Sequence, residues 1–222
     1  MSELSADPLF GRWLVLTETG PVLRGADLTG VDLGGRDLSG LVFEECVLSE
    51  ARLVRAVLDG CRWRGGRADR AAFADADLSD ARFDGVDLAG ARFGGALLTD
   101  AVFSGCRLTG AGLANSRGIG FTLTGCNLMA ANLRGCSFRG RTLERVRFDD
   151  ADLTSVDFTE AVFADCRLAG ADFRSARFDR ADLRGADLGD LDEAGCRALR
   201  GAHLGLDQAG AVLAVLGLTL VT

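Results

Sequence analysis

Apolar residues recur along the chain with a period of five. From Leu23 to Leu188, the residue numbers that leave remainder three on division by five hold Leu or Phe at 31 of 34 positions. Two positions before each of these central residues the side chain is usually small, and the other three positions are mostly polar or Gly. Because the phase is never lost, the pattern predicts one continuous repetitive domain without an internal boundary.

A period of five fits neither an α-helix nor a flat strand. On a helix the central residues would scatter around the axis, and on a flat strand an odd period would change face at every repeat. One geometry explains the period of five: two inward-facing residues lie on a short extended segment, and a tight turn follows before the next pair. Glycines at the turns, such as Gly25 and Gly85, suit a positive φ. If each corner turns by about 90°, four repeats close a square coil, residues twenty apart stack, and the interior is packed and dry.

Tandem units such as Ala-Asp-Leu-Ser-Asp at residues 76–80 resemble the pentapeptide-repeat family. The resemblance covers roughly residues 21–191. It implies an all-β fold, a right-handed quadrilateral β-helix of about 8.5 coils at the usual strand spacing.

The two ends of the chain depart from the repeat. Residues 1–20 contain Leu9, Phe10 and Trp13 in an apolar run, and we expect them to form an N-terminal cap that covers the open edge of the first coil. In the segment 192–222, the stretch Asp207–Leu216 predicts a short α-helix with an acidic first turn and Gly217 as its end, followed by a strand-like alternation over residues 218–221.

The predicted C-terminal helix is apolar on nearly all sides, so packing on one coil does not cover it. We therefore predict a homodimer through the C-terminal segment, and the alternative is a monomeric cap on the last coil. The candidate dimerisation residues are Leu206, Val212, Leu213, Val215, Leu216, Leu218 and Leu220.

The chemistry-bearing side chains favour a non-enzymatic protein without cofactor or metal. All seven cysteines occupy the small-residue position of the repeat, which indicates small buried apolar residues rather than ligands or disulfides: Cys46, Cys61, Cys106, Cys126, Cys136, Cys166 and Cys196. The only histidine, His203, follows Cys196 by seven residues, so a Cys–His nucleophile is the alternative interpretation. The chain has no Lys, no Tyr and no phosphate-binding glycine loop.

The repeat lapses at two places. In Trp63–Arg70 the central positions hold Trp63 and then Ala68, and in Gly112–Phe121 a central position holds Gly118. One interpretation is local repacking, with Ile119 or Phe121 replacing the missing leucine. The other is a loop that leaves the wall to contact a partner. The candidate loop residues are Trp63, Arg64, Arg67, Gly118, Ile119 and Phe121.

Charge is unevenly distributed along the chain, whose net charge is −7. The stretch Ser104–Phe148 has one acidic residue and seven arginines, whereas Asp149–Glu193 has thirteen acidic residues and five arginines. We expect the acidic block to steer a basic partner, with Asp152, Asp157, Asp172, Asp182 and Asp187 as candidate partner-facing residues. The net charge argues against direct nucleic-acid binding. The absence of an apparent signal peptide or membrane span predicts a cytoplasmic protein.

A helix after the coils resembles the Qnr/MfpA-type members of the pentapeptide-repeat family, which interact with DNA gyrase. That resemblance implies a dimeric, DNA-mimic-like modulator that binds a type II topoisomerase, DNA gyrase or topoisomerase IV, and protects it from quinolones or other poisons. The Arg-rich central coils depart from a uniformly acidic rod. The alternative is a protein-interaction scaffold that uses one of the two lapses as its docking surface.

Overall fold

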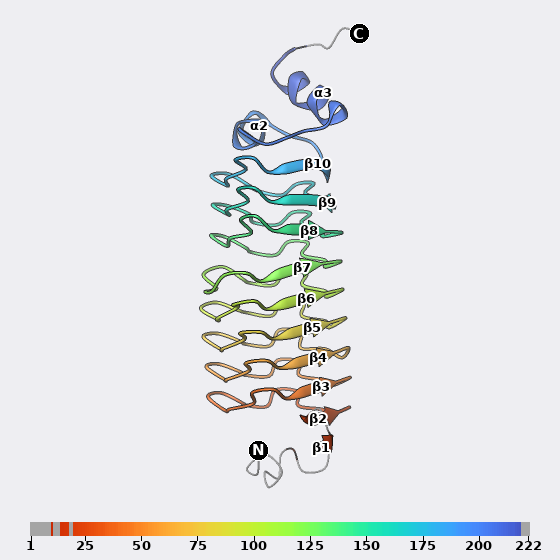
Figure 1. The fold of residues 1–222 in the computed structure, drawn as a ribbon, viewed down its shortest axis with the longest axis vertical. Coiled ribbons are helices and arrows are strands. Elements are labelled where there is room, and N and C mark those ends of the chain that lie inside the picture. The colour runs from red at the N-terminus through yellow and green to blue at the C-terminus, as the bar shows by residue number, and fades with distance from the viewer. Residues whose placement is uncertain (1–9, 11–13, 18–19, 219–222) are drawn as a thin grey trace.

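The chain folds into a rod in which coils stack along one axis (Figure 1). The computed structural model describes residue 10, residues 14–17 and residues 20–218. Strand order follows chain order from β1 to β10, and β2 to β10 are parallel. The strands are β1 (Leu14–Thr17), β2 (Gly20–Arg24), β3 (Val42–Glu44), β4 (Arg62–Arg64), β5 (Arg82–Asp84), β6 (Val102–Ser104), β7 (Thr122–Thr124), β8 (Thr142–Glu144), β9 (Val162–Arg167) and β10 (Asp182–Asp187). The predicted all-β, right-handed quadrilateral β-helix is confirmed.

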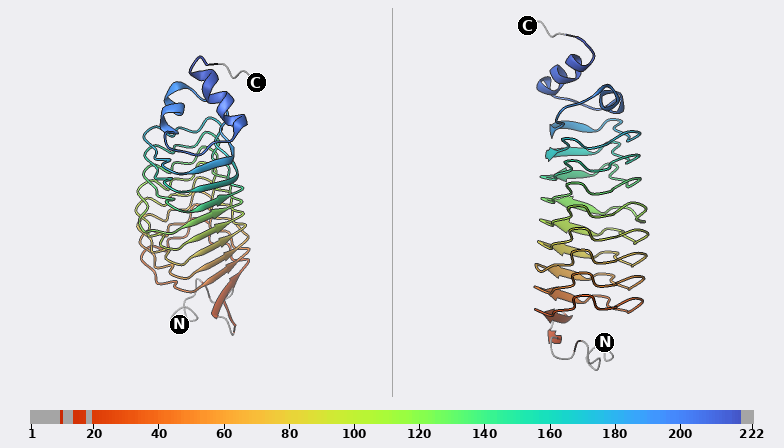
Figure 2. Two further views of the ribbon diagram at one scale, coloured as in Figure 1. Left: turned by 45° about the horizontal axis from the view of Figure 1, so that its top comes forward. Right: turned by 180° about the vertical axis from the view of Figure 1, so that it is seen from behind.

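Each coil has four faces, and residues twenty apart lie on adjacent coils of one face. Face 1 carries β2 to β10, where Leu23 pairs with Phe43 and Phe43 with Trp63. The other faces hold isolated parallel bridges with the same spacing. Figure 2 shows the coils stacked along the rod in two further views. We name them by their central residues: face 2 runs from Leu28 to Leu188, face 3 from Leu33 to Phe173, and face 4 from Leu38 to Phe178. Four repeats per coil are therefore confirmed.

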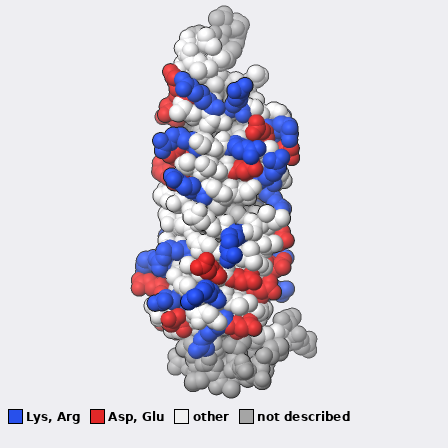
Figure 3. Space-filling view, turned by 90° about the vertical axis from the view of Figure 1, so that its left-hand side faces the viewer, with Lys and Arg blue, Asp and Glu red and all other residues white. Residues whose placement is uncertain are grey.

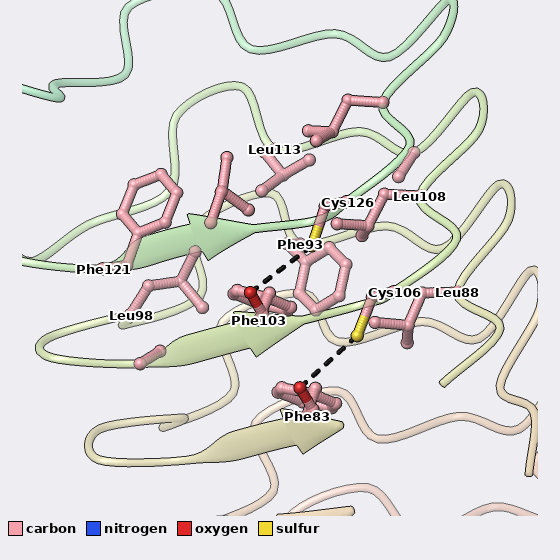
Figure 4. Close-up of a cluster of buried hydrophobic side chains, with 14 of the residues drawn as sticks. Phe83, Leu88, Phe93, Leu98, Phe103, Cys106, Leu108, Leu113, Phe121 and Cys126 are labelled. Atoms are coloured by element: carbon pink, nitrogen blue, oxygen red, sulfur yellow. Dashed lines mark hydrogen bonds between the residues drawn. The ribbon is translucent and has the colours of Figure 1, made fainter. Parts of the chain in front are cut away.

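The central residues form columns through the interior of the rod. Phe83 stacks on Phe103 with 4.8 Å between ring centroids and 2° between planes (Figure 4). Phe73 stacks on Phe93 at 4.9 Å and 2°. These separations match the spacing of neighbouring strands, so the aromatic columns and the backbone ladder reinforce each other.

The corners show that glycine is favoured but not required. The last residue of most repeats has a left-handed backbone, and sixteen described non-glycine residues adopt φ between 51° and 62°, Asp75 and Asp80 among them. Such a conformation costs about 1–2 kcal/mol for a residue with a Cβ. The N–H groups of Asp75 and Asp80 donate to carbonyls of the next coil at 3.1 and 2.9 Å. The ladder thus holds the corners in place.

The two ends add elements that differ from the coils. Strand β1 pairs antiparallel with β2, and Phe10 lies fully buried in the core. Of the predicted N-terminal cap, residues 1–9, 11–13 and 18–19 lie outside the described residues. At the other end, helix α3 (Leu206–Val215) matches the predicted helix closely. Residues 219–222 lie outside the described residues, so the predicted terminal strand remains a prediction.

A second C-terminal helix, α2 (Glu193–Ala198), was not predicted. Its N-cap residue Asp192 accepts a hydrogen bond from the Gly195 N–H at 2.7 Å. The amide of Gln208 in α3 donates to the carbonyls of Leu183 and Ala186, which ties α3 to the last coil. Neither these helices nor any other in the described part of the chain is long and apolar enough to cross a membrane.

Candidate interaction surfaces

The five aspartates predicted to face a partner lie on all four faces of the rod. By the twenty-residue register, Asp182 is on face 1, Asp187 on face 2, Asp152 and Asp172 on face 3, and Asp157 on face 4. Each carboxylate also accepts a hydrogen bond from the backbone N–H two residues later, at 2.9–3.1 Å. These side chains therefore stabilise their own turns and do not form a single acidic stripe.

Arginine neutralises each of these five carboxylates. Arg174 pairs with Asp172 and Arg184 with Asp182, both at 2.6 Å. The others pair at longer range, Asp152 with Arg134, Asp157 with Arg139 and Asp187 with Arg167. The hydrogen bonds from the Arg184 side chain and backbone lower the pKa of Asp182 to about 2. Contact of these five with a partner stays a prediction.

Uncompensated negative charge lies elsewhere in the acidic block. Among the described residues of 149–193, four carboxylates make no ion pair: Asp150, Asp165, Asp190 and Asp192. Asp165 lies at the corner between faces 1 and 2, and Asp150 and Asp190 lie at the corner between faces 2 and 3. These corner residues were not among the predicted ones, because composition does not show which carboxylates arginine neutralises.

The C-terminal end exposes much of its apolar surface. Leu206 is 90% exposed, and Leu216 and Leu218 are more than half exposed. Val212, Leu213 and Val215 are half-buried, and no residue of α3 is fully buried. Leu220 lies outside the described residues. The predicted dimer through this end stays a prediction, and its described candidate residues share one apolar end of the rod.

The first lapse is a repacked wall and not a projecting loop. Trp63 is 2% exposed and stacks between Phe43 and Phe83, with ring centroids 3.9 and 5.4 Å away. The next central residue of the same coil, on face 2, is the small Ala68, and we infer that its small size accommodates the indole. Strand β4 stays in register with β3 and β5. Local repacking therefore accounts for Trp63, and the candidate residues Arg64 and Arg67 are exposed on the wall.

The second lapse combines the two interpretations. Phe121 is 4% exposed and packs edge-on against Phe138, at 4.9 Å between ring centroids, so it replaces the leucine missing at Gly118. Ile119, in contrast, is 77% exposed. Gly118 and Gly120 have φ values of 90° and 91°, which a residue with a side chain rarely adopts. The wall therefore carries an apolar side chain that points to solvent.

All seven cysteines were predicted to be small buried residues, and six of them are buried, whereas Cys196 is only half-buried. Cys106 and Cys126 donate to the carbonyls of Phe83 and Phe103 at 3.5 and 3.4 Å (Figure 4). The other four buried thiols, Cys46, Cys61, Cys136 and Cys166, likewise donate to the carbonyl 23 residues earlier. Burial raises the pKa of Cys61 to about 12. Reactive thiolates are therefore disfavoured in the core.

Cys196 is half-buried and lies in α2. Burial raises the pKa of its thiol, which is the opposite of what an activated nucleophile needs. Within the described residues it makes no hydrogen bond to His203, and no group of His, Cys, Asp and Glu is arranged to hold a metal. The alternative Cys–His interpretation therefore finds no support in the geometry.

Comparison with known proteins identifies the repeat. Sequence models described as pentapeptide repeats match residues 19–92 and residues 76–113, 119–150, 126–163 and 151–190. The matched segments together cover most of the chain, and residues 114–118, at the second lapse, fall between them. No curated protein sequence matches the chain at a significant level.

Solved structures of the same fold resemble the chain along most of its length. Full-length QnrB1, described as a plasmid-mediated fluoroquinolone resistance protein, is 25% identical, with 89% of this chain and 100% of that chain covered and a TM-score of 0.65. A trypsin-treated QnrB1 variant is 25% identical over 90% and 99% of the two chains, with a TM-score of 0.62. HetL, a pentapeptide repeat protein involved in heterocyst differentiation regulation from the cyanobacterium Nostoc, is 27% identical over 82% and 81%, with a TM-score of only 0.38.

Proposed function

The chain belongs to the pentapeptide-repeat family, and from this premise we propose that it is a non-catalytic protein that binds a type II topoisomerase, DNA gyrase or topoisomerase IV. The observation that carries the proposal is the correspondence with QnrB1, which spans the whole of that chain. QnrB1 is described as a fluoroquinolone resistance protein, and the Qnr-type resemblance implies a topoisomerase as the partner. Protection of that enzyme from quinolones or other poisons would follow from occupation of its DNA-binding surface.

Negative charge at the C-terminal end would take the place of DNA phosphates. The block Asp149–Glu193 has a net charge of −8, and a homodimer joined through its C-terminal end would bring two such blocks together. Of the four carboxylates that arginine does not neutralise, Asp150, Asp165 and Asp190 lie at corners of the rod. They flank face 2, so we place the contact with a basic saddle of the topoisomerase along that face and its corners.

The proposal limits DNA mimicry to part of the rod. The stretch Ser104–Phe148 has a net charge of +6, and a surface of that sign would repel the DNA-binding saddle of a topoisomerase. We therefore expect the contact to involve the coils from Asp149 onward and not the full length of the rod.

A supercoiling assay with DNA gyrase, with and without a quinolone, tests the proposed function. We expect the protein to protect supercoiling in the presence of the drug at micromolar concentrations. The triple variant Asp150→Asn/Asp165→Asn/Asp190→Asn should require about tenfold more protein, as expected when rim charges that steer association are lost. A matched control is Asp59→Asn/Asp75→Asn/Asp80→Asn, which removes the same charge near the N-terminal end and should behave like the wild type. Wild-type protein without any effect would reject the proposal.

The homodimer has its own test. Light scattering should give twice the chain mass, and Leu206→Asp should reduce this to one chain, because it places a charge in the proposed apolar contact. A monomeric wild type would remove the dimer from the proposal without removing topoisomerase binding.

A protein-interaction scaffold is the second candidate function. The observation that favours it is Ile119, a large apolar side chain that is 77% exposed on the wall of the rod. Affinity capture that recovers other proteins but no topoisomerase would favour this role.

A further inference from the structure

The hydrogen-bond ladder between coils is interrupted at one place on face 4. One coil earlier, the N–H groups of Leu98 and Asp100 donate to the carbonyls of Arg117 and Ile119 at 2.8 and 3.0 Å. The equivalent donors of the next coil, Gly118 and Gly120, have no hydrogen-bond partner within the described residues. Bridges join Leu97 to Arg117 and Ser137 to Asp157, but none joins Arg117 to Ser137.

Backbone N–H groups of the coil on the other side of this interruption also lack hydrogen-bond partners within the described residues. By the register of the other repeats, the N–H groups of Ser137 and Thr142 would donate to the carbonyls of Ser116 and Phe121, and neither bond is present in the described structure. Strands β7 and β8 share a single register pair, whereas neighbouring strand pairs share three. The ribbons separate visibly between β7 and β8 (Figure 1). We call this place, lined by residues 116–121 and 137–142, the ladder break.

The cause of the ladder break lies in one corner column. At the position that follows face 4, other coils have Ala81, Ala101, Ala161 and Ala181, but here two successive coils have Phe121 and Arg141. The ring of Phe121 turns inward against Phe138, and Arg141 remains half-buried. The same column also holds Leu41 and Cys61, where the ladder is intact, so we attribute the separation of the coils to two large side chains in succession. The break is therefore encoded by particular residues.

The two segments that line the ladder break contain arginines and no acidic residue, and of these arginines Arg139 pairs with Asp157 of the next coil. No acidic residue occurs between Asp100 and Glu144, whereas Arg117, Arg139 and Arg141 border the break. Arg117 and Arg141 make no ion pair within the described structure. The side of the rod shown in Figure 3 has two belts of mixed charge with few charged side chains between them. Ile119, between Gly118 and Gly120 at the ladder break, adds an exposed apolar side chain.

We propose that the ladder break docks an extended, acidic segment of a partner protein. Such a segment offers alternating backbone donors and acceptors, which match the unpaired N–H groups of Gly118 and Ser137 and the unpaired carbonyls of Ser116 and Phe121. Its carboxylates would pair with Arg117 and Arg141. Nucleic-acid phosphates would meet the arginines but offer no backbone N–H for the carbonyls. The inference does not depend on topoisomerase binding, because the break lies outside the acidic coils.

Peptide selection tests the proposal directly. A display library of short random peptides is selected on the full chain and counter-selected on a repaired variant, Gly118→Leu/Phe121→Ala/Arg141→Ala, which restores the repeat pattern. We expect enriched peptides to be acidic, with β-branched or aromatic residues at alternate positions. Enrichment of basic peptides, or no enrichment over the counter-selection, would overturn the proposal. Circular dichroism establishes that the repaired variant is folded.

Surface variants that leave the core intact give the second measurement. The affinity of an enriched peptide should fall about tenfold in Ile119→Ser and in Arg117→Ala. A loss of that size is usual when one important contact of an interface is removed. Arg92 on face 3 is another exposed arginine that makes no ion pair within the described residues. Arg92→Ala is therefore the matched control and should leave the affinity of the peptide unchanged. Binding should also slow amide hydrogen exchange at Ser137 and Thr142. Equal binding to Ile119→Ser, or displacement of the peptide by duplex DNA at low concentration, would contradict an extended protein segment as the occupant.

Discussion

The indole of Trp63 lies parallel to the ring of Phe43, with 3.9 Å between ring centroids and 14° between planes. No other central position holds Trp, and the next one along the chain holds Ala68. A large and a small residue thus share the volume that two leucines or phenylalanines fill in other coils. This relationship turns an apparent lapse of the repeat into a compensated pair.

A double-mutant cycle tests this compensation. Trp63→Leu should destabilise the fold by about 2–4 kcal/mol because it leaves a cavity, and Ala68→Leu by about 1–3 kcal/mol because it overpacks the coil. The double variant should be less destabilised than the sum of the two, since it restores two leucines to the interior. Urea unfolding measures all four proteins. Strict additivity would show that the two residues do not share one volume.

Two glycines with similar backbone angles should respond differently to alanine. Gly66 has φ +73° and a Cβ there would lie 2.2 Å from the Cys46 carbonyl oxygen, whereas Gly110 has φ +65° with open space around it. Gly110→Ala should cost only the conformational strain, about 1–2 kcal/mol. Gly66→Ala should cost clearly more, because backbone must move. Thermal unfolding of the two variants compares them, and equal losses would contradict the close approach at Gly66.

The aspartates that accept hydrogen bonds within their turns should make the stability of the fold depend on pH in the acid range. Hydrogen bonds from Arg184, first its side chain and then its backbone, lower the pKa of Asp182 to about 2, against an ordinary value of about 3.9. A lowered folded-state pKa contributes stability that is present above pH 4 and is lost as the pH falls from about 4 to about 2. Urea midpoints across this range should fall less steeply for Asp182→Asn. Asp75→Asn, which removes a carboxylate without an ion pair, is the matched control and should retain the wild-type slope.

The buried thiols should resist alkylation in the folded protein. Burial raises the pKa of Cys61 to about 12, so its thiolate fraction at pH 8 is about one in ten thousand. Mass spectrometry after iodoacetamide treatment should find Cys196, which is half-buried, modified first and the other six protected. All seven should react in denaturant. Rapid modification of Cys106 in the folded protein would show that the core opens locally.

The ladder break should be visible in hydrogen exchange without any partner. Asp157 and Val162 N–H groups donate to carbonyls of the preceding coil at 3.0 and 2.9 Å, but the equivalent Ser137 and Thr142 groups do not. We expect the Ser137 and Thr142 amides to exchange at least about a hundredfold faster, because they need no opening of a bond. Nuclear magnetic resonance compares these four amides. Similar protection of both pairs would mean that the ladder is closed in solution.

The repeat made the coil geometry predictable, since a five-residue period with small and large inward residues admits few arrangements. It did not predict α2, because six residues with a glycine in their middle carry little helical signal. The partner-facing aspartates were chosen by composition alone, and composition does not show that Asp172 and Asp182 each have an arginine two residues later that neutralises them. The ladder break depends on Phe121 and Arg141, which are twenty residues apart and become neighbours only when the coil closes.

The ladder break also has a mechanical consequence. Bonds between the same two coils persist on faces 2 and 3, where Leu108 and Leu113 N–H groups donate to the Asn127 and Asn132 carbonyls at 2.7 and 2.8 Å. A rod that is joined on one side and open on the other bends more easily about the joined side than in any other direction. We therefore expect a hinge with a preferred direction near the middle of the molecule, so that the acidic C-terminal coils can tilt relative to the N-terminal coils without unfolding.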